Sequence, residues 1–271
     1  MMHPRITIHK GIRMLVAVDI GNTNIVLGFL DGDDIIGTYR ITTKSNHTSD
    51  EYGLMITQFL ALSGLRPSDI DDVIIASVVP KVMHSFRASI IKFLNINPMV
   101  VGPGIKTGIN IRIDDPKSLG SDCLADCVGA YYTYGGPVLV ADFGTATTAS
   151  VVDRKKNYIG GMIIPGIRVS LDGLASHASQ LSRISLDAPK KIFGTNTTDC
   201  MKSGLLYGNA AMLDGIVDRM EEELGEPATV LATGGLASLI VPLCKKTIIL
   251  DDNLLLRGLN LIYKKNQENN H

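Results

Sequence analysis

The apolar positions of the chain occur in short runs that are separated by turn residues. Runs at 14–19, 25–30 and 35–41 flank the turns at 21–24 and 31–32, a pattern typical of three antiparallel strands joined by hairpins. A capping box formed by Thr48 and Glu51 predicts a helix that ends near Gly64. The continuous β-branched run at 73–79 predicts a parallel strand buried on both faces, followed by a helix at 81–94 and a short strand at 98–101.

The same pattern starts again in the second half. Apolar runs at 138–142, 146–152 and 157–164 predict another hairpin meander. Helices at 166–177 and 198–224, a strand at 229–233, a helix from 236, a strand at 247–250 and a last helix from 253 follow it. We therefore expect an α/β fold of two duplicated lobes, each a β-meander plus α/β units, at residues 14–135 and 136–271. A nucleotide cleft between the lobes is the expected place for ligands.

Each predicted meander opens on the same short signature. Asp19-Ile-Gly21-Asn-Thr23 and Asp142-Phe-Gly144-Thr145 align strand, acid, glycine and hydroxyl residue, 123 positions apart. A glycine turn lets backbone N–H groups approach an anion, and Thr or Asn side chains add donors for phosphate oxygens. The aspartates would oppose phosphate unless they hold Mg²⁺, so Asp19 and Asp142 are the metal-site candidates.

Either turn taken singly could equally be an ordinary hairpin, because Asp, Gly, Asn and Thr are common turn residues. Their repetition at the starts of both halves favours the phosphate interpretation. A third loop, Gly234-Gly235 after the strand at 229–233, would let adenosine lie flat against backbone. The sequence predicts these nucleotide-binding residues: Asp19, Gly21, Asn22, Thr23, Asn24, Gly144, Thr145, Thr147, Thr148, Gly234 and Gly235.

Other folds and partners are less well supported by the sequence. The chain contains neither a Rossmann nor a P-loop glycine motif and no nucleophile elbow. The chain has 26 Lys and Arg against 27 Asp and Glu, so its net charge favours neither nucleic acid nor a membrane as partner. Four scattered cysteines and a polar start without a signal peptide indicate a reduced, cytoplasmic protein. Residues 1–13 are interpreted as an N-terminal extension.

Several motifs together closely resemble the type III pantothenate kinases, of the actin and hexokinase superfamily. The nucleotide motifs are Val18-Asp-Ile-Gly-Asn-Thr-Asn24, Asp142-Phe-Gly-Thr-Ala-Thr-Thr148 and Thr233-Gly-Gly-Leu-Ala237. Further similar segments are Ser49-Asp-Glu-Tyr-Gly53, Ser77-Val-Val-Pro80, Val101-Gly-Pro-Gly-Ile-Lys-Thr-Gly108, Gly160-Gly161, Pro165-Gly166 and Ser203-Gly204. The resemblance extends over about residues 14–263.

This resemblance implies a fold of two actin-like (ribonuclease H-like) lobes and an activity. Members of the family transfer phosphate from ATP to pantothenate, giving 4'-phosphopantothenate in coenzyme A biosynthesis. They are homodimers that need Mg²⁺ and a monovalent cation, K⁺ or NH₄⁺. The family's general base falls on Asp122, and a threonine that reaches the substrate from the partner subunit falls on Thr197. The implied substrate-binding residues are Gly120, Ser121, Asp122, Cys123, Ile113 and Thr197.

Two of those positions depart from the family pattern. Cys123 stands where the family has Arg, and Ile113 stands where it commonly has Tyr. An arginine can form a bidentate pair with a carboxylate, which cysteine cannot. Two alternatives therefore stay open: a kinase of the same fold acting on another small hydroxyl substrate, and a non-catalytic nucleotide-binding paralogue.

Overall fold

The computed structural model describes residues 14–189 and 191–268; the predicted extension at 1–13 lies outside this part. The chain forms two compact units. The first contains residues 14–108, 117–129 and 255–268, and the second contains Ile109–Pro116 and Ala130–Leu254. These units differ from the predicted lobes at 14–135 and 136–271: the C-terminal helix joins the first unit, whereas Ile109–Pro116 and residues 130–135 join the second.

A five-stranded sheet forms the centre of the first unit. Its order is β3-β2-β1-β4-β5, with β1, β2 and β3 antiparallel and β4 and β5 parallel to β1. The strands are β1 Met14–Ile20, β2 Asn24–Asp31, β3 Asp34–Thr42, β4 Asp72–Ser77 and β5 Met99–Val100. The inner residues of β4 are all buried, as predicted from its continuous apolar run.

Helices cover both faces of this first sheet. Helices α1 (Ser49–Leu62) and α2 (Pro80–Leu94) pack on one face, where Tyr52 and Phe86 are fully buried. Helix α7 (Leu254–Gln267) packs on the other, and a β-carbon at Gly28 of β2 would lie 2.7 Å from Leu256. The predicted capping box is present: Glu51 N–H donates to Thr48 Oγ1 at 3.3 Å, and Thr48 N–H donates to Glu51 Oε2 at 2.7 Å.

The second unit repeats the same strand order. Its sheet is β11-β10-β7-β8-β9-β6, so a meander of three strands again continues into two parallel strands. The strands are β6 Asn110–Ile111, β7 Val138–Phe143, β8 Ala146–Val152, β9 Asn157–Pro165, β10 Thr229–Thr233 and β11 Ile249–Leu250. Both ends of β9 lie 123 positions after the ends of β3, which confirms the predicted duplication.

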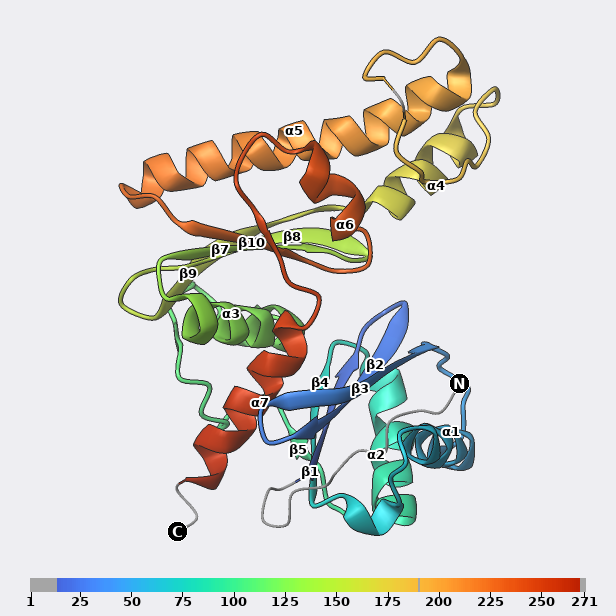
Figure 1. Ribbon diagram of the computed structural model, residues 1–271, viewed down its shortest axis with the longest axis vertical. Helices are drawn as coiled ribbons and strands as arrows, with labels where there is room; N and C mark the ends of the chain where they lie inside the picture. The colour runs from blue at the N-terminus through green and yellow to red at the C-terminus, as the bar shows by residue number, and fades with distance from the viewer. Residues whose placement is uncertain (1–13, 190, 269–271) are drawn as a thin grey trace. The chain divides into compact units, whose positions relative to one another are not determined.

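Helix α5 (Thr197–Leu224) runs along one face of the second sheet (Figure 1). Its buried residues, among them Leu206 and Leu213, share a core with Leu139 of β7 and Val230 of β10. The remaining helices are α3 Ser121–Tyr134, α4 Ile167–His177 and α6 Ala237–Ile240, with short 3₁₀ turns at Pro67–Asp69, Pro116–Ser118 and Val241–Leu243. In the described part of the chain, no helix is long and apolar enough to cross a membrane.

The helix contact between α7 and α3 leaves no space for a side chain at Gly258. A β-carbon there would overlap the carbonyl oxygen of Ala125 and lie 2.6 Å from its carbon. We expect Gly258→Ala to lower the free energy of unfolding by about 1 to 3 kcal/mol, because the helices must move apart. Gly208→Ala is the control: Gly208 lies in α5 with nothing within 4 Å, so alanine should stabilise by about 0.5 to 1 kcal/mol. Urea unfolding measures both, and equal effects would contradict the packing.

Candidate functional site

The first predicted phosphate turn connects β1 to β2. Gly21 N–H donates to Asn24 O at 3.0 Å and closes the turn. Asn22 and Thr23 are exposed at its apex, while Asp19 is partly buried at the end of β1. A β-carbon at Gly21 would lie 3.8 Å from Asp19 Oδ2, so the carboxylate stands directly beside the glycine backbone.

The second predicted turn has the same design in the other unit. It connects β7 to β8, and Gly144 N–H donates to Ala146 O at 3.1 Å. A β-carbon at Gly144 would lie 3.4 Å from Asp142 Oδ2. The first turn is one residue longer, because Asp19 pairs with Val26 whereas Asp142 pairs with Thr148. The two signatures align in sequence, but they close in different ways.

Hydroxyl groups surround the second turn. Thr145 is exposed at the apex, Thr147 is buried, and Thr148 lies directly opposite Asp142 in the ladder. Thr147 Oγ1 is buried and makes no hydrogen bond to any residue that the structure describes. A buried hydroxyl without a hydrogen-bond partner is costly. This loop therefore contains a hydrogen-bonding group, Thr147 Oγ1, that its own fold does not use.

The predicted third loop lies against Asp142. Strand β10 pairs in parallel with β7 so that Thr233 stands opposite Asp142, and Gly234 therefore follows at the same edge of the sheet. Gly234 has φ +91°, and a β-carbon there would overlap Asp142 Oδ1 and lie 2.7 Å from Phe143 N. Only glycine fits this conformation and this space. The structure therefore brings together the second and third nucleotide motifs.

Asp122 lies at the start of α3, next to the end of β4. Ser77 of β4 pairs with Ile20 of β1, and its N–H donates to Ser121 Oγ at 3.0 Å. Ser121 Oγ also lies 3.2 Å from Ser77 O, to which it donates. These contacts fix the helix beside β4, the neighbour of the strand that carries Asp19. The predicted base and the first phosphate turn thus belong to one unit and are held by neighbouring strands.

The backbone around Asp122 orients its carboxylate toward the helix start. Cys123 N–H donates to Asp122 Oδ1 at 2.8 Å, and a β-carbon at Gly120 would overlap this same oxygen. A carboxylate in the first turn of a helix is stabilised by the helix dipole. Ser121 is the first residue of the helix, and its hydroxyl is bonded to β4.

Ile113 and Cys123, the two positions that depart from the family pattern, belong to different units. Ile113 follows β6, which pairs with Asn157–Tyr158 of β9, and Arg112 N–H donates to Tyr158 O at 2.8 Å. Cys123 is the third residue of α3. The sequence assigned both to the first lobe, because a strand of two residues has no hydrophobic signal of its own.

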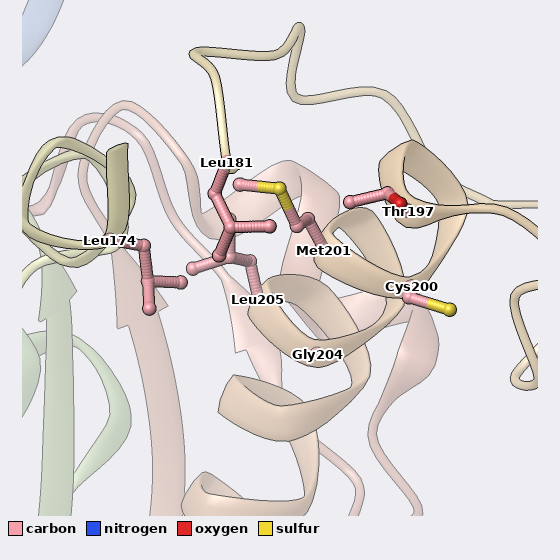
Figure 2. Close-up of a pocket in the computed structure, with 7 residues that line it drawn as sticks. All are labelled: Leu174, Leu181, Thr197, Cys200, Met201, Gly204 and Leu205. Atoms are coloured by element: carbon pink, nitrogen blue, oxygen red, sulfur yellow. The ribbon is translucent and has the colours of Figure 1, made fainter. Parts of the chain in front are cut away.

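Thr197 begins α5 and lines an apolar pocket of about 500 Å³ (Figure 2). Leu174 of α4 and Leu181 lie on one side, and the first two turns of α5 form the other. The lining residues of α5 are Thr197, Cys200, Met201, Gly204 and Leu205. This pocket is apolar, unlike the two phosphate turns, and Thr197 provides a hydroxyl at its edge.

Two residues that the sequence left without a role support the turns. Thr43 follows β3, and its hydroxyl donates to Gly21 O at 2.7 Å. Gly166 follows β9, and a β-carbon there would overlap Thr145 O and lie 2.6 Å from Gly144 O. The Pro165-Gly166 pair was one signal in the sequence for the second contact. No local pattern pointed to Thr43, which lies 22 positions from its partner.

Among the described residues, no group of three or more His, Cys, Asp or Glu side chains is arranged to hold a metal ion. A divalent cation at Asp19 or Asp142 would therefore take most of its oxygen ligands from water and a bound phosphate group. That is the usual coordination of Mg²⁺ in phosphoryl-transfer sites, so the residues present fit Mg²⁺.

Comparison with known proteins places the chain in a family. A family model described as type III pantothenate kinase matches residues 15–219. The chain belongs to the type III pantothenate kinase family. It is 56% identical over 253 residues to the type III pantothenate kinase of Bifidobacterium longum subsp. infantis, covering 93% of this chain and 99% of that one. With that of Halalkalibacterium halodurans it shares 44% identity over 253 residues, covering 93% and 100%. The kinase assignment is confirmed.

Solved structures of lower identity share the fold. The activator of the 2-hydroxyisocaproyl-CoA dehydratase from Clostridium difficile, with bound ADPNP, superposes with a TM-score of 0.55 at 16% identity, covering 94% of this chain and 97% of that one. Component A of the (R)-2-hydroxyglutaryl-CoA dehydratase from Acidaminococcus fermentans gives 0.54 at 15%, covering 93% and 98%. The predicted α/β class with two duplicated actin-like units is confirmed.

Proposed function

We propose that the protein phosphorylates pantothenate at its terminal hydroxyl with ATP, giving 4'-phosphopantothenate for coenzyme A biosynthesis. The observation that carries this proposal is the pair of Asp-x-Gly turns at corresponding strand ends, in a chain 44–58% identical to type III pantothenate kinases over 93% of its length. Nothing in the comparisons supports another hydroxyl substrate or a non-catalytic role, the two alternatives left open by the sequence.

The nucleotide would be held by backbone groups and single carboxylates. The turns Gly21–Asn24 and Gly144–Thr148 would receive the phosphates, and Gly234-Gly235 would lie against the adenosine. Mg²⁺, bound with ATP, supplies positive charge at the transferring phosphoryl group. Asp19 and Asp142 would hold it, directly or through water. The family also implies a monovalent cation, K⁺ or NH₄⁺.

Asp122 would act on the pantothenate hydroxyl. Its place beside Ser121 and β4 suits a base that orients the hydroxyl and accepts its proton. We attribute most of the rate to positioning and to charge neutralisation at the phosphates.

Pantothenate also has a carboxylate, which Cys123 and Ile113 would meet in place of the family's Arg and Tyr. We propose that substrate binding here is correspondingly weak, because a charge-assisted contact is absent.

We further propose a homodimer in the cytoplasm, with Thr197 reaching the substrate of the partner subunit. The second unit exposes many large apolar side chains, including Ile163 at 83% and Phe193 at 82%. Others are Ile159, Met162, Val169, Leu174 and Ile192. They belong to β9, α4 and the segment before α5, and Thr197 is the first residue of α5. Exposed apolar groups of this number are typical of a protein interface.

The first prediction concerns the three carboxylates. Asp19→Asn, Asp142→Asn and Asp122→Asn should each lower kcat about 100-fold or more, because each removes charge at the reacting groups. Their melting temperatures should stay within about 3 °C of the parent. ADP release is measured with ATP, Mg²⁺ and K⁺, with and without pantothenate, and with Na⁺ replacing K⁺. Asp34→Asn, at the exposed start of β3, is the control. ADP release independent of pantothenate in the parent would contradict the proposed substrate.

A second prediction concerns the carboxylate of pantothenate. Cys123→Arg should lower the KM for pantothenate about 10-fold or more, since a charge-assisted hydrogen bond is worth about 1.5 to 3 kcal/mol. The KM for ATP should remain nearly unchanged. The gain is expected to be larger with Ile113→Tyr, and the two effects need not be additive. A double variant that binds pantothenate no better than the parent would count against this assignment.

Coexpression of two inactive variants tests the shared site. Thr197→Ala and Asp122→Asn should each have little activity as homodimers. In a mixed dimer, one site combines an intact Asp122 with an intact Thr197, so coexpression should restore about a quarter of parent activity. A monomer in sedimentation analysis, or no recovery in verified mixed dimers, would refute the proposal.

Phe193→Asp should favour the monomer, whereas Leu62→Asp, at 69% exposure on α1, should not.

A further inference from the structure

Three of the four carbonyl groups of the Gly21–Asn24 turn accept hydrogen bonds from internal donors. Thr43 Oγ1 donates to Gly21 O at 2.7 Å, Thr43 N–H donates to Thr23 O at 2.9 Å, and Gly21 N–H donates to Asn24 O at 3.0 Å. Asn22 is exposed at the apex of the turn. A phosphate site needs backbone N–H groups toward the anion and carbonyl oxygens away from it. Thr43 holds two of these three carbonyls.

The segment that carries Thr43 is itself fixed by helix α1. The hydroxyl of Tyr52, a fully buried side chain, donates to Lys44 O at 2.9 Å. Burial raises the pKa of Tyr52, so its hydroxyl remains a donor well above neutral pH. The Tyr52 ring packs against the rings of Phe86 of α2 and His47, with ring centroids 5.2 Å and 5.3 Å apart, respectively. The segment that follows Thr43 is therefore anchored to α1.

The second unit has a turn support at the corresponding position. Gly166 lies 123 positions after Thr43, and each follows the third strand of its meander. Gly166 contacts the second turn through its backbone, because a β-carbon there would lie 2.6 Å from Gly144 O. A support at the same place in both copies suggests that the contact serves the turn. The first turn has one residue more, and a longer loop has more conformational freedom to lose.

We propose that Thr43 is a positioning residue for the nucleotide, and that its hydroxyl sets the phosphate-binding shape of the Gly21–Asn24 turn through Gly21 O. This rests on the proposed function, since it assumes that the turn binds the phosphates of ATP. It adds a residue outside the Asp-x-Gly-Asn-Thr signature. Thr43 would not touch the nucleotide or the reacting atoms.

The test replaces the hydroxyl without changing the shape of the side chain. Thr43→Val should raise the KM for ATP and the Kd for MgADP about 5- to 10-fold, the effect of losing the one hydrogen bond made by the hydroxyl, because valine keeps the backbone N–H that bonds Thr23 O. The KM for pantothenate should change less than about twofold, because the substrate site is elsewhere. Thr43→Ser keeps the donor and should restore both constants to within about threefold of the parent. Thr42→Val is the control, because Thr42 is the exposed neighbour on β3.

Calorimetry with MgADP separates this proposal from the proposed function. If the parent binds MgADP but does not phosphorylate pantothenate, the proposed function is wrong. The comparison of Kd values for MgADP between Thr43→Val and Thr43→Ser still decides the role of Thr43. Equal Kd values for MgADP in the parent and Thr43→Val would overturn the proposal. It would also be overturned if Thr43→Ser bound as weakly as Thr43→Val, because then the hydroxyl would not be the group responsible.

Discussion

The close approach of the Gly234 backbone to the Asp142 carboxylate constrains the geometry of the second unit. Gly234 reaches Asp142 only because it has no β-carbon and adopts φ +91°. This contact in turn requires the parallel register that sets Thr233 opposite Asp142. The register is stabilised by the core that α5 shares with β7 and β10. A change in packing beneath the sheet would therefore move the carboxylate relative to the loop, so fold stability and site geometry are coupled here.

The elements with strong local signals were predictable from the sequence. The continuous apolar run of β4, the capping box at Thr48 and the repeated Asp-x-Gly turns each identify their structure through neighbouring residues, and all were found. The contacts that support the turns were not predictable in the same way. Thr43 bonds Gly21 across 22 positions, and only the pairing of β2 with β3 brings them together. Such contacts follow from the tertiary fold and leave no periodic pattern.

Chain order also proved a poor guide to which unit holds each segment. Helix α7 comes last in the sequence, yet Asn260 donates to Gly32 O at 2.8 Å and Lys264 pairs with Asp33 at 2.6 Å, both in the β2–β3 turn. Residues 109–116 precede the second meander, yet they extend its sheet through β6. Helix α7 covers a face of the first sheet, and β6 extends the edge of the second. In both cases the covering segment is distant in the sequence from the strands that it contacts.

The two meanders have kept one geometry while their turns have diverged. Each places an aspartate at the end of its first strand and a glycine in the turn that follows. The first turn has an extra residue and is held by a hydroxyl, whereas the second is shorter and is held by the backbone of Gly166. A nucleoside triphosphate is itself asymmetric, with a reacting phosphate at one end and adenosine at the other. In the proposed function each turn would meet a different part of ATP, and turns that differ in length and in support suit a ligand whose two ends differ.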